Sequence, residues 1–213
     1  MAKEWDLGYG MSYRFAKDRD FQTYDKVTGD IPTENTDSRL REQTANVYVS
    51  LSKNYATGTS VSISATGEYY TIGNYRKWAV YPQASLTYVK SSEHLFQFSL
   101  STDKTYPGYW DMQSSVSHLN GYTELWGTPG LKPSTAYNLN GNYIWKQKYI
   151  FGLFFMHTSD FFVQTGYQST DRLALIYKNT NWNYMQMWGT NVILPFKACL
   201  LYTSPSPRDL STS

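Results

Sequence analysis

The residues best able to do chemistry in this sequence are few and scattered. Its three histidines, His94, His118 and His157, follow no spacing of a metal-ligand motif. The sequence contains no phosphate-binding glycine loop, dinucleotide fingerprint or nucleophile elbow. Ser and Asp are so plentiful that their presence indicates no particular nucleophile. We therefore predict that this is not an enzyme, with no catalytic residue, no metal site and no cofactor, and that the histidines have isolated polar roles.

Three aromatic residues of one long segment are better candidates for a binding role. Trp110, Tyr122 and Trp126 lie within 103–136, a stretch without regular alternation. Flat aromatic rings stack on sugars and other ligands, and equally well pack a loop against its surroundings. Both interpretations stay open, and in the first the ligand is a small solute or a glycan.

The segments that must position these residues alternate strictly between apolar and polar side chains. From Tyr137 to Trp145, for example, tyrosine, leucine and tryptophan share one face, and Asn138, Asn140 and Asn142 the other. This period of two predicts strands with one apolar and one polar face. The expected strands are 5–15, 44–52, 60–70, 80–89, 96–101, 137–145, one beginning at 149, and 184–196.

Charged residues on the polar faces of these strands have two possible roles. Asp6, Arg14 and Glu68 fall there. They either contact a passing solute or form hydrogen bonds to neighbouring strands. In the last two strands apolar residues occupy both faces, so the sequence does not decide their orientation.

The connections between strands alternate in length. Expected long connections are 17–43, 72–78, 103–136 and 159–183, and the intervening turns at 54–58, 91–94 and 146–148 are short. A meander with short turns at one end and long loops at the other is typical of transmembrane β-barrels. The predicted fold class is therefore all-β, an antiparallel up-and-down transmembrane β-barrel, present as about eight strands of a larger barrel.

The composition agrees with a barrel wall. Of the 213 residues 17% are aromatic and only 17% are charged. The mean hydropathy of −0.52 is compatible with such a wall because only alternate residues face lipid. The net charge is +2 without a basic stripe, which predicts no nucleic-acid partner.

The segment Gly127-Thr128-Pro129-Gly130-Leu131-Lys132-Pro133 carries a resemblance to a known family. It resembles the G-N-P-x-L-K-P-E signature of TonB-dependent outer-membrane receptor barrels, in the version found in Bacteroidetes-type barrels. The motif positions are Gly127, Pro129, Leu131, Lys132 and Pro133. The chain departs from the signature at Thr128, where Asn is usual, and at Ser134, where Glu is usual. The stretch 106–112, with Tyr, Trp and Asp, resembles one that precedes the signature.

This resemblance implies a bacterial outer-membrane protein surrounded by lipid. It implies energised uptake of a scarce or bulky solute, such as a siderophore, vitamin or oligosaccharide. TonB would act through a plug domain that this chain lacks, so the chain alone is not expected to transport. Two alternatives remain: a plug-less outer-membrane barrel acting as an adhesin or structural protein, and a soluble glycan-binding β-sheet protein.

The two ends of the sequence suggest a piece of a longer protein. The N-terminus shows no charged region followed by an apolar export signal. Residues 199–213 look derived from a sequencing adapter, because Cys199 to Asp209 match its translation; a Ser/Pro-rich tail is the alternative. We therefore predict a barrel piece over 1–198 and no domain in 199–213. The only cysteine lies in this tail, so no disulfide is expected before it.

Overall fold

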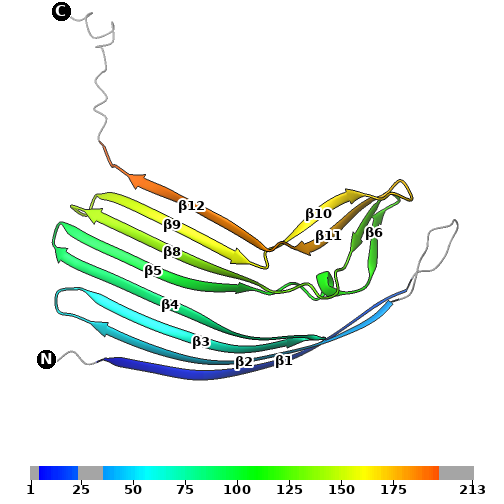
Figure 1. Ribbon diagram of the computed structural model, residues 1–213, viewed down its shortest axis with the longest axis horizontal. Coiled ribbons are helices and arrows are strands. Elements are labelled where there is room, and N and C mark those ends of the chain that lie inside the picture. Colours follow the sequence, from blue (N-terminus) through cyan, green and yellow to red (C-terminus); the bar gives the residue numbers. More distant parts are fainter. Residues whose placement is uncertain (1–4, 24–35, 197–213) are drawn as a thin grey trace, which may run out of the picture.

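Two β-sheets make up most of the part of this protein that the structure describes (Figure 1). The computed structural model describes residues 5–23 and 36–196. The larger sheet, called the wall, has eight strands in the order β1-β2-β3-β4-β5-β8-β9-β12, and each pairs antiparallel with its neighbours. Its strands are β1 (Asp6–Gln22), β2 (Thr36–Asn54), β3 (Ser60–Ile72), β4 (Tyr75–Ser91), β5 (His94–Thr105), β8 (Ser134–Trp145), β9 (Tyr149–Ser159) and β12 (Tyr184–Ile193).

The wall is an open, curved sheet, because β1 and β12 form its two edges and do not pair with each other among the described residues. The predicted class, an antiparallel partial barrel of eight strands, is confirmed. Within residues 5–23 and 36–196 no helix has the length and apolar composition needed to span a membrane.

The smaller sheet belongs to a second unit, called the cap, which lies at the long-connection end of the wall (Figure 1). The cap comprises residues 106–133 and 160–183. Its strands pair in the order β10-β11-β7-β6, with β11 and β7 parallel. Its elements are η1 (Trp110–Met112), β6 (Val116–Asn120), β7 (Thr123–Trp126), β10 (Phe162–Gln168) and β11 (Leu175–Asn181).

Large apolar side chains cover the outer face of the wall. On β1, Tyr9 and Met11 are 78% and 87% exposed, and the residues that alternate with them, Gly8, Gly10 and Ser12, lie on the inner face. The register keeps each type on one face across the sheet, since Met11 pairs with Val47 and Ser12 with Asn46. A sheet that exposes its apolar face is stable where that face meets lipid instead of water.

Aromatic rings pack against one another at two levels of this outer face. Near the short turns, a row runs Tyr88–Phe96–Tyr143–Phe151, with successive centroids 6.2, 4.8 and 6.1 Å apart. Near the cap, Trp78 packs on Tyr69 at 4.6 Å. Trp78 and Tyr88 are ten residues apart on β4. At about 3.3 Å per residue and a tilt of about 40°, that is roughly 25 Å along the membrane normal, the height of the apolar band in such barrels.

The orientation of β9 and β12 is decided by pairing with the rest of the wall. Phe151, Leu153 and Phe155 of β9 share the outer face with their partners in β8 and β12. Phe154 is an apolar residue on the inner face of β9, and its position there has a local explanation. Its ring lies over Gly189 of β12, where any side chain would overlap the ring. Aromatic cover of a strand glycine replaces the packing that the glycine lacks.

Two predicted connections were wrong because strands continue beyond the apolar band. Residues 17–43 were expected to be a polar connection, yet β1 and β2 stay paired from Phe15↔Gln43 to Gln22↔Thr36. Ion pairs such as Arg19–Asp37, at 3.0 Å, bridge this extension. The expected loop 72–78 is instead a tight turn, with Gly73 at φ +54° between Ile72 and Tyr75. An alternating pattern of apolar and polar residues identifies only those strand segments whose two faces meet different surroundings. A strand extension with water on both faces has no such pattern, so it is not predicted.

The two remaining long connections contain short elements of their own, and the expectation that 103–136 is irregular was wrong. Residues 103–136 contain η1, β6 and β7, and residues 159–183 contain β10 and β11. These strands are short: β6 pairs with β7 and β10 with β11, and the two hairpins are joined by the parallel pairing of β7 with β11, 52 positions apart in sequence, as in Thr123↔Leu175. The pairing of β7 with β11 leaves no local signal, because the two strands lie in different connections.

Candidate functional site at the junction of wall and cap

The closest packing in the described structure occurs where the cap meets the inner face of the wall. Tyr70 and Ile72 of β3 pack with Met112 and Leu131 of the cap in one buried cluster. Tyr70 and Leu131 are each only 1% exposed. The residues that fix this junction are therefore the candidates for function.

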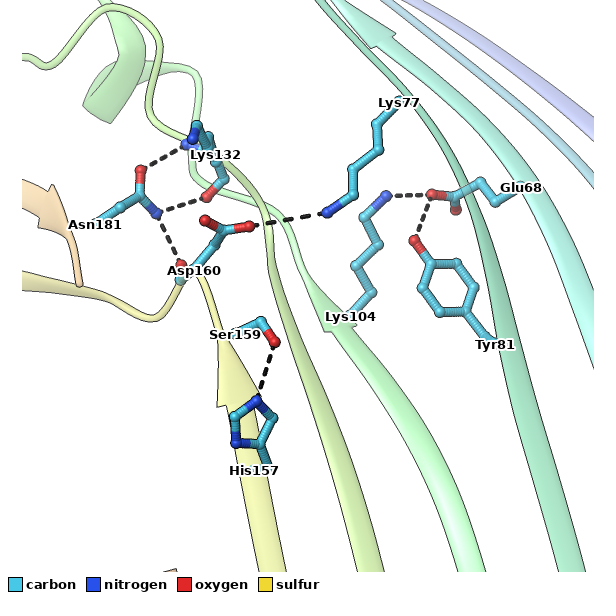
Figure 2. Close-up of polar contacts among 9 residues, drawn as sticks. All are labelled: Glu68, Lys77, Tyr81, Lys104, Lys132, His157, Ser159, Asp160 and Asn181. Carbon is cyan, nitrogen blue, oxygen red and sulfur yellow. Dashed lines mark hydrogen bonds and ion pairs between the residues drawn. The ribbon is translucent and has the colours of Figure 1, made fainter. Parts of the chain in front are cut away.

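A buried carboxylate, Glu68, lies beside this cluster and has three partners. It forms an ion pair with Lys104 and accepts a hydrogen bond from the Tyr81 hydroxyl at 3.3 Å (Figure 2). It also accepts a hydrogen bond from the Tyr106 hydroxyl. The Lys104 ammonium also lies 4.4 Å from the ring centroid of Tyr70. A buried charge is tolerated only when it is paired and hydrogen-bonded in this way.

Lys104 reaches Glu68 because the β4–β5 ladder has ended. Both strands continue, but their pairing stops at Ala84↔Leu100. Pro82 follows at this point; proline has no N–H to donate, and its carbonyl accepts a hydrogen bond from Thr102 Oγ1 at 2.7 Å. The side chain of Lys104 therefore bonds across the opening between the two strands.

A second buried carboxylate, Glu42, fastens the cap to β1. Its two oxygens bind Arg14 of β1 and the hydroxyl of Tyr109 of the cap. Burial, followed by the hydrogen bond to Glu42, raises the pKa of Tyr109 to about 12. Burial likewise raises the pKa of Tyr106 above its ordinary value. Both phenols therefore stay protonated and donate to carboxylates at neutral pH.

Two of the charged strand residues considered in the sequence analysis, Arg14 and Glu68, form ion pairs with other residues of the protein. Arg14 and Glu68 are engaged across strands or with the cap. Sequence reasoning missed Glu42 and Lys104. Glu42, Thr44 and Asn46 are alternate residues of β2 and lie on the same polar face. Continuing the alternating pattern beyond the apolar band would therefore have identified Glu42.

The signature segment provides the backbone of the junction. A side chain at Gly127 would overlap the carbonyl oxygen of Gln113, and Gly130 has φ +85°. Leu131 and Pro133 are fully buried. Three of the five motif residues, Gly127, Leu131 and Pro133, are thus positioned by backbone geometry or packing, and Pro129 borders the crevice described below.

Lys132, the fifth motif residue, is held through its backbone. Asn181 at the end of β11 accepts from Lys132 N–H at 2.8 Å, and its amide group donates to Lys132 C=O at 3.0 Å (Figure 2). The same amide group donates to the carbonyl of Asp160 at 2.8 Å, and the Asp160 carboxylate lies 3.8 Å from the ammonium of Lys77 on β4. Asn181 therefore joins the two cap connections, a role that its isolated position in the sequence did not indicate.

The three loop aromatics lie on different parts of the cap. Trp110 is in η1 and is 43% exposed, and Tyr122 is in the β6–β7 turn and is 65% exposed. Tyr122 borders a shallow hollow of about 210 Å³ together with Leu173 and Leu175. Trp126, in β7, is half-buried and donates from Nε1 to Glu124 at 2.8 Å.

Glu124 is a third buried carboxylate, within the cap. Arg172 donates to its oxygens at 2.6 and 2.7 Å, and His118 lies 3.7 Å away. Burial opposes ionisation, but the hydrogen bonds from Trp126 and Arg172 outweigh it, and the pKa of Glu124 lies below its ordinary value.

A crevice of about 550 Å³ opens between wall and cap. Leu40, Ile72 and Tyr75 border it from the wall, and Met112 and Leu131 from the cap. Ser38, Asn74 and Ser114 add polar groups. Its size and mixed lining are those of a site for a small solute.

The histidines have separate partners. His94 Nδ1 lies 2.7 Å from the Tyr143 hydroxyl, and His157 is bonded to Ser159 at 3.3 Å and Gln186 at 3.1 Å. Among residues 5–23 and 36–196, no three His, Cys, Asp or Glu side chains come together as metal ligands would.

A lipid-facing wall with a polar inner face, and long connections folded over one end, defines an outer-membrane β-barrel protein. The outer membrane protein beta-barrel family matches residues 1–203, and the chain belongs to this family. It is a protein of the bacterial outer membrane, which sets aside the soluble alternative. No curated protein matches the chain significantly.

Solved structures of similar fold are siderophore receptors. The ferric enterobactin receptor PfeA of Pseudomonas aeruginosa, a mutant in complex with enterobactin, is 15% identical with a TM-score of 0.62 over 93% of this chain and 32% of that one. The siderophore receptor PirA of Acinetobacter baumannii is 14% identical with a TM-score of 0.57 over 89% of this chain and 31% of that one. This chain therefore spans about a third of their length. The proteins that share its fold here are receptors and not enzymes.

Proposed function

We propose that the chain forms part of the wall and the solute-contacting cap of a TonB-dependent receptor for energised uptake. The observation that carries this proposal is the crevice between wall and cap, bordered by the signature residues Pro129 and Leu131. A purely structural barrel does not need a folded cap held by buried ion pairs over its inner face. The similarity of fold to siderophore receptors supports the proposal.

The proposed role of the cap is to make the first contacts with solute. Trp110 and Tyr122 present exposed rings, and the indole N–H of Trp126 is already bonded to Glu124. We assign stacking on a solute to Trp110 and Tyr122, and support of β7 to Trp126. The solute then reaches the crevice, where Tyr75 and Asn74 supply hydrogen bonds and Leu131 an apolar surface.

The test is uptake by the full-length protein, expressed in the outer membrane of a host with and without TonB. The probes are radiolabelled ferric enterobactin, radiolabelled vitamin B12 and a fluorescent oligosaccharide. We expect accumulation of one probe that requires TonB and falls at least five-fold in a Trp110→Ala, Tyr122→Ala double variant. Leu119→Ala, an exposed cap residue, is the control.

Other results identify the rival function. Diffusion of all small solutes without TonB would indicate a plug-less pore. No passage of any probe, with adhesion of cells to glycan-coated surfaces, would indicate an adhesin. Either outcome contradicts the proposal.

A further inference from the structure

A hollow on the outer face of the wall is created by one missing side chain. Gly141 of β8 lies between Phe98 of β5 and Leu153 of β9 in the register. A Cβ at Gly141 would meet no atom within 4 Å. The neighbouring rows are filled by large residues, so the hollow, of about 600 Å³, is confined to this part of the wall.

The lining of the hollow is apolar and partly aromatic. Phe96, Tyr143 and Phe151, three members of the outer aromatic row, form its end toward the short turns. Phe98 and Leu153 form its sides. The hollow lies within the outer-face band that contacts lipid, so an apolar chain is the occupant with access to it.

Positive charge gathers at the turn end beyond this row. The β4–β5 and β8–β9 turns are in contact, since Lys146 N–H donates to Glu93 C=O at 2.7 Å. Exposed Lys90, Lys146 and Lys148 stand there with one acidic residue, Glu93. The Lys146 ammonium lies 5.1 Å from the Trp145 ring centroid, at the level where headgroups begin.

The spacing between hollow and charge suits a lipid. Gly141 and Trp145 are four residues apart on β8, which corresponds to roughly 10 Å along the membrane normal for a tilted strand. We propose that the hollow at Gly141 holds one acyl chain of an anionic phospholipid, whose phosphate is bound by the lysines of the two adjoining turns.

The experiment compares phospholipid retained by the full-length protein, purified from outer membranes in mild detergent and measured by native mass spectrometry. The variant Gly141→Phe fills the hollow, and Ala65→Phe adds the same ring to an exposed outer-face position of β3 outside it. Gly141→Leu serves if the phenylalanine variant does not show the heat-modifiable band of a folded barrel.

The expected result is bound phospholipid on the wild type and on Ala65→Phe, with at least a three-fold loss on Gly141→Phe. A Lys146→Gln, Lys148→Gln variant is expected to lose its preference for phosphatidylglycerol over phosphatidylethanolamine in exchange experiments. Equal retention by Gly141→Phe and wild type would overturn the proposal. So would a Leu153→Cys variant that cross-links to a neighbouring protein, because the hollow would then be a protein contact.

Discussion

Leu153 in the wall and Leu119 in the cap are almost equally exposed, at 66% and 63%, yet their surroundings differ completely. Leu153 lies in a continuous apolar face that spans the sheet, and Leu119 is a single apolar residue on a small sheet beyond the membrane band. The exposed fraction of an apolar side chain therefore does not by itself fix how that side chain affects the free energy of folding. Exposure stabilises where the neighbour is lipid and is nearly neutral or costly where the neighbour is water.

The two regions also hold together differently. The wall is one layer of long antiparallel ladders, with small uncharged residues such as Ser62, Ser85 and Asn140 on its inner face. The cap has short strands and depends on side-chain anchors: Glu42 and Glu68 at the wall, Glu124 and Asn181 within the cap. Backbone bonding is enough for a sheet in which every strand pairs with the next wall strand along the chain. A unit assembled from two distant connections needs specific side chains.

The largest expected effect comes from the backbone of the signature. Gly127→Val should destabilise the cap by on the order of 4 kcal/mol, because the new side chain overlaps the carbonyl of Gln113. Limited trypsin digestion of intact cells should then cleave the cap while the wall keeps its heat-modifiable mobility on gels. Gly121→Ala is the control, since a Cβ there meets no atom within 4 Å. Simultaneous loss of wall and cap would show that the two regions fold as one unit.

Introducing a positive charge at each of the two exposed leucines tests whether the wall and the cap face different solvents. Leu153→Arg should lower the unfolding free energy of the wall by about 3 kcal/mol, the cost of an arginine on a lipid face. Leu119→Arg should change stability by less than about 0.5 kcal/mol, as surface substitutions do. Urea unfolding in lipid vesicles measures both. Equal effects at the two positions would contradict a lipid-facing wall.

The contact of Tyr109 with Glu42 tests how the cap is fastened. Tyr109→Phe should weaken the cap by about 2 kcal/mol, because the buried carboxylate loses a donor. Since folding raises the pKa of Tyr109 from 10.0 to about 12, its stabilisation is complete below pH 10 and is lost as pH rises to about 12. Protease susceptibility against pH should show this transition in wild type and not in the variant. Tyr122→Phe, an exposed control, should leave it unchanged.

The smallest effect is expected inside the cap. Glu124→Gln should cost about 1 kcal/mol at neutral pH, because Arg172 is partly exposed and solvent weakens the pair. The folded pKa of Glu124 lies below 4.5, so its stabilisation is present above that pH and is lost as pH falls through the folded pKa. Acid titration of cap proteolysis should be steeper in wild type than in the variant. Asp171→Asn, nearby and exposed, should retain the wild-type profile.

Much of the wall was predictable because lipid and a polar interior impose opposite preferences on alternate residues. The eight strands and the short turns at 54–58, 91–94 and 146–148 were located from sequence. The cap strands and the extensions of β1 and β2 were not located from sequence. Neither has one face toward lipid and the other toward a polar interior, so neither alternates between apolar and polar residues. Among the candidate residues, the signature was found by resemblance, whereas Glu42, Lys104 and Asn181 were recognised only from their partners.

The sequence by itself determined that this chain is a meander of strands with one lipid-facing and one polar face. That information is local, because each strand has its own alternation of apolar and polar residues with a period of two. Only the tertiary structure decided that the long connections form a sheet, that Gly141 leaves a hollow, and that buried carboxylates fasten cap to wall. Those features depend on residues far apart in the chain, such as Glu42 with Tyr109 and Lys132 with Asn181. Contacts of this kind exist only after the strands are in register, because register brings their side chains within bonding distance.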